Sequence, residues 1–80
     1  MELYIGNLPD DYTQEELKDT FSKLGEIKSV KIITDLVTHE SKGYGFVEME
    51  NSEDGQKAID ELDGQTINGN VIFVKKAHRE

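Results

Sequence analysis

The sequence predicts an α+β domain in which a four-stranded antiparallel sheet carries two helices on one face. Three observations favour this class. Three segments place apolar residues at alternate positions, as strands do, and a fourth near the C-terminus is a short apolar run. Two further segments repeat apolar residues every three or four positions, as amphipathic helices do. These segments follow one another in the order β-α-β-β-α-β. The chain has 80 residues and no cysteine, so we expect residues 1–80 to form one domain with a single core and no disulfides.

The first strand is predicted at residues 2–6. In an extended segment Leu3 and Ile5 fall on one face, while Glu2 and Tyr4 fall on the other. The uncharged aliphatic face is the one suited to a core. We therefore expect Tyr4 to point away from the core, on the same face as a carboxylate.

The first helix is predicted at about residues 14–24. Thr13 is followed three positions later by Glu16, which is the pattern of a capping box at a helix N-terminus. Gly25 favours termination of the helix just after its last turn. The apolar residues at helical spacing, which should pack on the sheet, are Leu17, Phe21 and Leu24.

The second strand is predicted at residues 27–33 and the third at about 43–50, with a polar loop at 35–41 between them. In the second strand, Val30 and Ile32 are expected to face the core. The outward positions of that strand are then Ser29, Lys31 and Ile33.

The second helix is predicted to begin after Asn51 or Ser52, either of which is a suitable N-cap residue. Acidic residues occupy its first turn, where the helix dipole favours negative charge. The predicted end of the helix is Asp63-Gly64. Its apolar stripe consists of Gly55, Ala58, Ile59 and Leu62.

The last strand is predicted at residues 71–76. The preceding Asn68-Gly69 dipeptide is a turn signal, which we interpret as the tip of a small hairpin. Both faces of the segment Val71–Val74 are apolar, so periodicity alone does not decide which side chains of this strand face inward.

This order of elements predicts the sheet topology. Each β-α-β crossover should be right-handed, and in the split form each crossover leaves room for a further strand between its two ends. The expected strand order is therefore 4-1-3-2, the arrangement of a ferredoxin-like sandwich. Both helices must cover the same face because their apolar stripes have no other surface on which to pack. The opposite face of the sheet is left open.

Charge is distributed unevenly along the chain. The formal net charge is −8, from 9 basic and 17 acidic residues, which argues against a nucleic-acid partner when taken as a whole. However, residues 10–26 hold six acids and residues 50–63 hold another six. Both segments coincide with the predicted helices. The acidic charge should therefore lie behind the sheet, where screening weakens its effect on the open face.

The third strand contains the residues that predict a function. One of its faces would carry Lys42, Tyr44, Phe46 and Glu48, and the other would carry Gly43, Gly45, Val47 and Met49. Burying an unpaired carboxylate and an ammonium group would cost several kcal/mol or more, so the second set should face the helices. Tyr4, Tyr44 and Phe46 are then exposed together on two adjacent central strands. Such an aromatic cluster is typical of a binding surface.

Unstacked nucleic-acid bases fit a flat aromatic surface flanked by lysines, because every base offers a π-face. The stretch Lys42–Met49, KGYGFVEM, resembles the RNP1 signature of the RNA recognition motif (RRM) at six of seven specified positions. The stretch Leu3–Leu8, LYIGNL, resembles its RNP2 partner. The likeness extends over about residues 2–77. Met49 replaces the usual aromatic residue at the end of RNP1, at a position that faces the core.

This resemblance implies a set of RNA-binding residues. Tyr4 and Tyr44 would stack bases, Phe46 would stack or pack against a sugar, and Lys42 would pair with a phosphate. Phe73 would face outward beside them on the last strand. The remaining candidates are Asn7, which we expect either to cap a turn or to contact a base, and Lys31, Lys75 and Lys76, which either add positive potential or are ordinary surface charges.

The leading hypothesis is a non-enzymatic module that binds single-stranded RNA, or single-stranded DNA, with low affinity and limited sequence specificity. No catalytic residue, metal site or cofactor is expected. The alternative is a protein-interaction domain of the same fold with little RNA binding, which would hold its partner on the sheet or on the acidic helices. We expect a monomer without a membrane segment. The chain looks most like small bacterial single-RRM proteins, which implies a cytoplasmic location, or a nuclear one for a domain of a longer eukaryotic protein.

Overall fold

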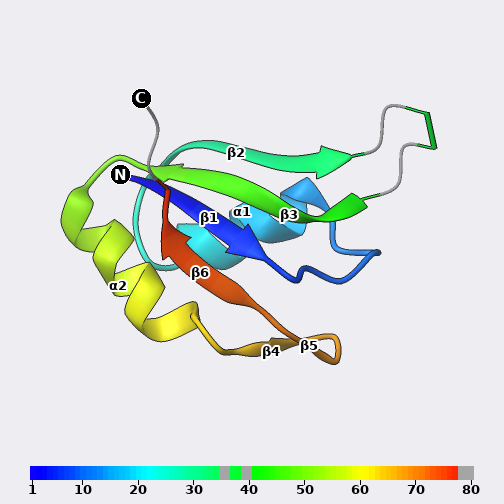
Figure 1. The fold of residues 1–80 in the computed structure, drawn as a ribbon. Coiled ribbons are helices and arrows are strands. Elements are labelled where there is room, and N and C mark those ends of the chain that lie inside the picture. The colour runs from blue at the N-terminus through cyan, green and yellow to red at the C-terminus, as the bar shows by residue number, and fades with distance from the viewer. Residues whose placement is uncertain (35–36, 39–40, 78–80) are drawn as a thin grey trace.

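The fold is known from a computed structural model that describes residues 1–34, 37–38 and 41–77, including all side chains in these ranges except those of 41 and 42. Figure 1 shows the elements, which follow one another along the chain as β1 (Glu2–Gly6), α1 (Gln14–Ser22), β2 (Ile27–Thr34), β3 (Ser41–Met49), α2 (Ser52–Leu62), β4 (Thr66–Ile67), β5 (Asn70–Val71) and β6 (Phe73–Lys76). The predicted β-α-β-β-α-β order is confirmed, with a small additional hairpin before the last strand.

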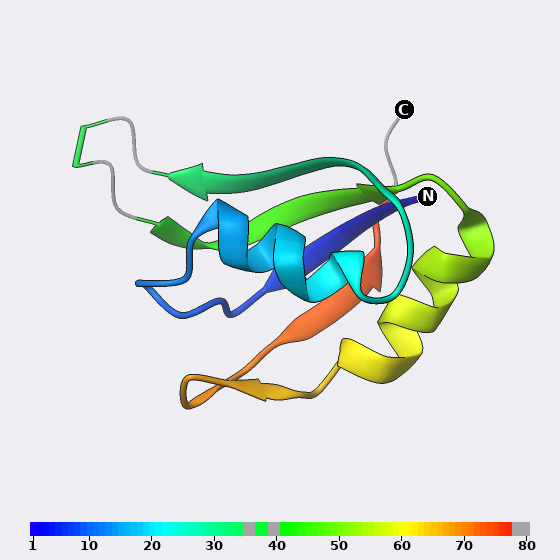
Figure 2. The ribbon, with the colours of Figure 1, turned by 180° about the vertical axis from the view of Figure 1, so that it is seen from behind.

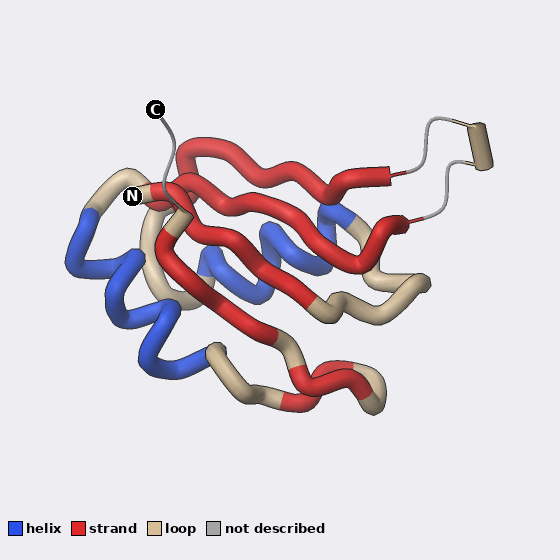
Figure 3. Tube along the Cα trace, viewed as in Figure 1, coloured by secondary structure: helices blue, strands red, loops and turns tan. Residues whose placement is uncertain are grey.

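The main sheet has four strands in the order β2-β3-β1-β6, and each neighbouring pair is antiparallel. Read in reverse, with β6 as the fourth main strand, this is the predicted order 4-1-3-2. The two central strands are therefore β1 and β3, because β3 fills the gap between β1 and β2, the two ends of the first crossover. This pairing brings the two stretches that resemble RNP2 and RNP1 side by side (Figure 3).

The helices cover one face of the sheet and leave the other open, as predicted. Figure 2 shows the molecule from behind, with α1 lying across the strands and α2 beside it. Among the residues that the structure describes, no helix has the length and apolar character needed to span a membrane.

The N-terminus of α1 is capped as expected. The Thr13 hydroxyl accepts a hydrogen bond from the Glu16 backbone N–H at 3.1 Å, and a Glu16 carboxylate oxygen accepts one from the Thr13 N–H at 3.2 Å. Two otherwise unsatisfied donors of the first turn are thereby paired. The helix ends at Ser22, two residues earlier than predicted, with Lys23 as its C-cap.

The N-terminus of α2 differs in detail from the prediction. Asn51 occupies the N-cap position, but its side chain makes no capping hydrogen bond to the backbone. Its amide group instead donates to the Asp54 carboxylate at 3.3 Å. Glu53 and Asp54 still place negative charge in the first turn, where it interacts favourably with the helix dipole.

The segment after α2 forms the predicted hairpin. Asn68 and Gly69 have φ values of 47° and 88°, the left-handed pair that a two-residue type I′ connection requires. The hairpin takes up Val71 as part of β5, so the last strand of the main sheet begins at Phe73 rather than at 71. Ile72 lies between the two strands and is fully buried.

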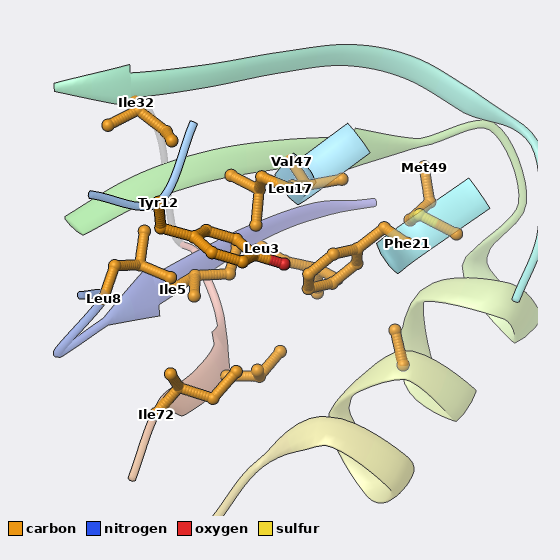
Figure 4. Packing of buried hydrophobic residues seen from close by; sticks show 12 residues of the cluster. Leu3, Ile5, Leu8, Tyr12, Leu17, Phe21, Ile32, Val47, Met49 and Ile72 are labelled. Atoms are coloured by element: carbon orange, nitrogen blue, oxygen red, sulfur yellow. The ribbon is translucent and has the colours of Figure 1, made fainter. Parts of the chain in front are cut away.

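The core fills the space between the sheet and the helices (Figure 4). Leu3, Ile5, Val47 and Met49 contribute from the central strands, and Phe21 contributes from α1. The other buried members are Leu8, Tyr12, Leu17, Ile32, Ala58, Ile72 and Val74. This set confirms the predicted inward faces of β1 and β3, including the inward position of Met49.

Candidate nucleic-acid interface

Three aromatic side chains form a cluster on the open face of β1 and β3. Tyr4 lies directly across from Phe46, and Tyr44 lies across from Gly6, the next outward position of β1. The ring centroids of Tyr4 are 5.9 Å from Tyr44 and 5.8 Å from Phe46, and those of Tyr44 and Phe46 are 6.3 Å apart. All three side chains are half-buried, because each ring covers part of the next. We call these three residues the aromatic platform.

The three rings of the platform meet at different mutual angles. Tyr4 and Tyr44 are tilted by 34°, whereas Tyr44 and Phe46 are perpendicular at 90°. Edge-to-face and tilted arrangements are the favourable ones for aromatic pairs at this separation. The three rings therefore stabilise one another on the open face.

Phe73 extends the apolar surface onto β6. Its Cα is paired with that of Gly6, in the same outward phase as Tyr4, while Val74 beside it is fully buried. The side chain of Phe73 is 50% exposed. The register that the sequence left open is thus resolved with Phe73 on the open face, as the resemblance implies.

Lys75 is also on the open face, across from Tyr4, but its charge is already engaged. Its Nζ is 3.1 Å from Oδ2 of Asp63, the C-cap residue of α2. The other oxygen of Asp63 accepts the Val74 backbone N–H at 2.8 Å. The pKa of Asp63 is held below its ordinary value of 3.8, mainly by the hydrogen bond from the Val74 N–H and secondly by that from Lys75.

The other three lysines occupy different environments. Lys31 is exposed on the open face, with its Cα paired to that of Phe46. Lys76 is exposed but lies across from the buried Leu3, so its position belongs to the helix side of the sheet. Lys42 lies within β3, and its side chain is outside the described part of the structure.

Asn7 has a structural role at the end of β1. It adopts a left-handed conformation with φ of 59°, and its side-chain amide donates to the Val71 carbonyl at 2.7 Å. The Asn70 amide in turn donates to the Asn7 carbonyl at 3.3 Å. These bonds tie the β4–β5 hairpin to the end of β1 and so fix the chain just before Phe73. The bond from Asn7 to Val71 joins two elements far apart in the sequence and is not a turn cap, and contact of Asn7 with a base stays a prediction.

The opposite end of the open face is acidic. Glu2 and Glu48 are directly paired across β1 and β3, two residues from the Tyr4–Phe46 pair. Lys28 approaches Glu48 at 4.0 Å, and Ser29 lies 3.5 Å from the same carboxylate. This end of the open face therefore carries two carboxylates, of which that of Glu48 lies near Lys28.

Two residues that shape this face were not predicted from the sequence. Asp63 engages Lys75, and no sequence pattern links the end of α2 to the middle of β6. Gly6 provides space beneath the Tyr4 ring, because a Cβ atom there would lie 3.0 Å from Tyr4 Cε1. Among the residues that the structure describes, no cluster of histidine, cysteine or carboxylate side chains has the geometry of a metal site.

A comparison with protein families now identifies this arrangement. Residues 3–72 match the model of the RNA recognition motif. The chain belongs to the RNA recognition motif family. In this RRM the RNP1 and RNP2 stretches are the paired central strands β3 and β1, and the aromatic platform consists of their outward side chains.

Several known proteins resemble this RRM in sequence, and some of them have solved structures with the same fold. Small RNA-binding protein 11, chloroplastic, from Arabidopsis thaliana, is 41% identical over 75 residues, which is 94% of this chain and 51% of the relative, so the chain spans about half of that protein. The crystal structure of RNA-binding protein PG1 superimposes with a TM-score of 0.95 at 39% identity, covering 100% of this chain and 96% of PG1. A structure of the Sxl-lethal protein in complex with RNA has a TM-score of 0.94 at 34% identity, covering 99% of this chain and 47% of the other.

Proposed function

We propose that this RRM binds single-stranded RNA by stacking bases on the aromatic platform, without catalysis. The observation that supports this most directly is the mutual contact of three rings on an uncovered sheet face. Membership of the RRM family and the RNA complex of a structural neighbour support RNA as the partner. Each base offers a flat π-face, so stacking requires no particular sequence, and limited specificity follows.

The path of the phosphates follows from the charges around the platform. Glu2 and Glu48 repel them from one end of β1 and β3. Lys31 lies beside Phe46 and offers positive charge. Lys42 is the second residue that we propose to pair with a phosphate. Lys75 contributes less positive potential because it forms an ion pair with Asp63. Lys76 occupies a position on the helix side of the sheet. With about two phosphate contacts, the logarithm of affinity should fall with the logarithm of salt concentration with a slope on the order of −2.

The affinity expected from this platform is modest. Stacking contributes about 1–3 kcal/mol per base, and ordering a flexible strand offsets part of that gain. For two or three stacked bases this corresponds to a Kd in the micromolar range, or roughly −8 kcal/mol.

The decisive experiment is a titration of the Tyr44→Ala/Phe46→Ala double variant. The probe is a fluorescein-labelled octanucleotide of random RNA sequence, measured by fluorescence anisotropy at low salt. We expect the wild-type protein to bind and the double variant to show no detectable binding, while circular dichroism shows the same fold. A control double variant, Glu15→Ala/Gln56→Ala, changes two exposed residues of the helices and should bind as the wild type does. Equal affinity of the platform variant and the wild type would reject the stacking model.

Further measurements test the remaining expectations. A DNA octanucleotide tests whether single-stranded DNA is also bound, and sedimentation tests the predicted monomer. If the wild-type protein fails to bind RNA at high micromolar concentration, the protein-interaction alternative with a partner on the acidic helices gains support. The cytoplasmic location stays a prediction, since the Arabidopsis relative is a chloroplastic protein by name.

A further inference from the structure

The geometry around Gly6 points to a positioning role for this residue in the aromatic platform. Gly6 is the outward position of β1 that follows Tyr4 on the same face, and its Cα pairs with Tyr44 on one side and Phe73 on the other. It therefore occupies the middle of a row of outward positions that crosses β3, β1 and β6. Strands in a sheet are about 4.8 Å apart, so this row spans about 10 Å, the reach of two or three stacked bases.

The Tyr4 ring occupies the space that a side chain at position 6 would fill. A Cβ atom there would lie 3.0 Å from Cε1, 3.1 Å from Oη and 3.3 Å from Cζ of Tyr4. These separations are shorter than the optimal carbon contact of about 3.5–4.0 Å. The ring thus leans along β1, low over the backbone of Gly6, and this placement depends on the absence of a side chain.

Backbone conformation does not explain a glycine at this position. The φ value of Gly6 lies outside the left-handed region, unlike those of Gly43, Gly64 and Gly69. An ordinary β-strand residue would therefore fit the backbone, and glycine in a strand costs conformational entropy and packing. The compensating gain must lie in what the missing side chain allows, which here is the position of Tyr4.

Gly45 provides a useful contrast. A Cβ atom at Gly45 would lie 2.5 Å from the Lys31 carbonyl oxygen and 3.3 Å from the Ile32 Cα, both of which belong to the backbone of β2. Gly45 is therefore required for the pairing of β2 with β3. The three atoms nearest to a Cβ at Gly6 all belong to the Tyr4 side chain, which can shift by a few tenths of an ångström without a change in the backbone.

We propose that Gly6 positions the Tyr4 ring for base stacking, an inference that rests on the proposed RNA-binding function. One edge of the Tyr4 ring, with Cε1, Cζ and Oη, occupies the space above Gly6, so this placement of the ring requires that position 6 has no side chain. The Tyr4 and Tyr44 ring planes are inclined by 34°, the smallest of the three interplanar angles in the platform. A side chain at position 6 would lift the Tyr4 ring away from the sheet and disturb this shared surface.

The test uses two variants of increasing size, Gly6→Ala and Gly6→Val, titrated with the random RNA octanucleotide. We expect RNA affinity to fall about threefold for Gly6→Ala, which is less than the loss of one stacked base, and about tenfold for Gly6→Val, which is within the range expected for one stacked base. The melting temperature should stay equal or rise, because both residues suit a strand better than glycine. A merely structural role predicts the opposite, namely a loss of stability. Unchanged affinity in both variants would overturn the proposal.

A double-mutant cycle with Tyr4→Ala shows whether the effect passes through the ring. In the Tyr4→Ala background, either change at position 6 should leave the residual affinity unaltered. An equal fold-loss in both backgrounds would show that Gly6 acts independently of Tyr4, and would overturn the proposal. If Gly6→Val does not fold, the double-mutant cycle is measured with Gly6→Ala only.

A measurement without RNA separates this inference from the proposed function. In the wild-type protein, nuclear Overhauser effects should connect the Tyr4 ring protons with the Hα protons of Gly6, and these should weaken in Gly6→Ala. Absence of the contact in the wild type would refute the positioning role even if RNA binds. If the contact is present and the wild type binds no RNA, the placement of the ring stands and its use in stacking is refuted.

Discussion

Phe46 and Val47 are neighbours in the chain and lie on opposite faces of the sheet, and they differ in almost every physical respect. Val47 is fully buried between the sheet and the helices, whereas Phe46 is half-exposed and contacts two other rings. The same contrast holds for Tyr4 between the buried Leu3 and Ile5, because side chains alternate between faces with a period of two. One face therefore supplies stability and the other remains available for a ligand. We therefore expect substitutions in the aromatic platform to have little effect on the fold.

The largest expected effect concerns the helix-covered face. Phe21 is fully buried at the centre of the core, so Phe21→Ala should lower the free energy of unfolding by about 3–5 kcal/mol. Chemical denaturation measures this loss. Under conditions where the variant is still folded, RNA affinity should equal that of the wild type. A variant that stays folded yet binds RNA tenfold more weakly would contradict the separation of the two faces.

The sharpest test is the adjacent pair Phe46→Ala and Val47→Ala. Val47→Ala should lower the free energy of unfolding by about 2 kcal/mol and leave RNA affinity unchanged, because a buried valine contributes roughly that amount. Phe46→Ala should lower RNA affinity by about 1–3 kcal/mol and affect stability less than Val47→Ala does. Thermal melts and anisotropy titrations of both variants give the four values. If both changes reduced affinity equally, the two faces would not be functionally distinct.

A smaller effect is expected at the start of α1, on the helix side. Thr13→Ala removes the hydroxyl that accepts the Glu16 N–H, and the loss of an N-cap costs about 1 kcal/mol. Thr13→Ser keeps the hydroxyl and serves as the matched control, which should retain most of the stability. Both variants should bind RNA as the wild type does. Equal stability of all three proteins would show that the capping box contributes nothing measurable.

The smallest effect is expected where the two faces are linked, at Asp63. The pKa of Asp63 is lowered in the folded protein by the Val74 N–H and by Lys75. A lowered folded pKa means that this contribution is complete above the ordinary value of 3.8 and is lost as pH falls through the folded pKa. Asp63→Asn should therefore show a shallower loss of melting temperature below about pH 4 than the wild type. If the melting temperatures of Asp63→Asn and the wild type fell equally at acid pH, the Asp63 carboxylate would make no pH-dependent contribution to stability.

The same variant also tests the open face. Asp63→Asn releases Lys75 from its ion pair, so the salt slope of RNA binding should become steeper by up to about one unit. Lys75→Ala in the wild-type background is the control and should leave the slope nearly unchanged. A slope that is the same in Asp63→Asn and the wild type would show that Lys75 lies too far from the RNA to contribute.

Local sequence alone determined most of the fold. The alternation of Leu3 and Ile5 with Tyr4, the Thr13–Glu16 capping box and the Asn68-Gly69 turn each depend on interactions within a few residues, so their patterns are readable directly. The outward phase of Tyr44 and Phe46 was likewise predictable, because burying Lys42 and Glu48 would cost several kcal/mol. That single energetic argument predicted the orientation of the platform.

The tertiary structure decided what depends on residues far apart in sequence. The engagement of Lys75 by Asp63, and the tie between Asn7 and Val71, join segments that only the completed sheet brings together. The register of Phe73 was undecided because its neighbours are apolar on both faces. Likewise, the need for glycine at position 6 follows from the lean of the Tyr4 ring. Side-chain packing of this kind leaves no periodic signal in the sequence, since it depends on three-dimensional contact rather than on spacing along the chain.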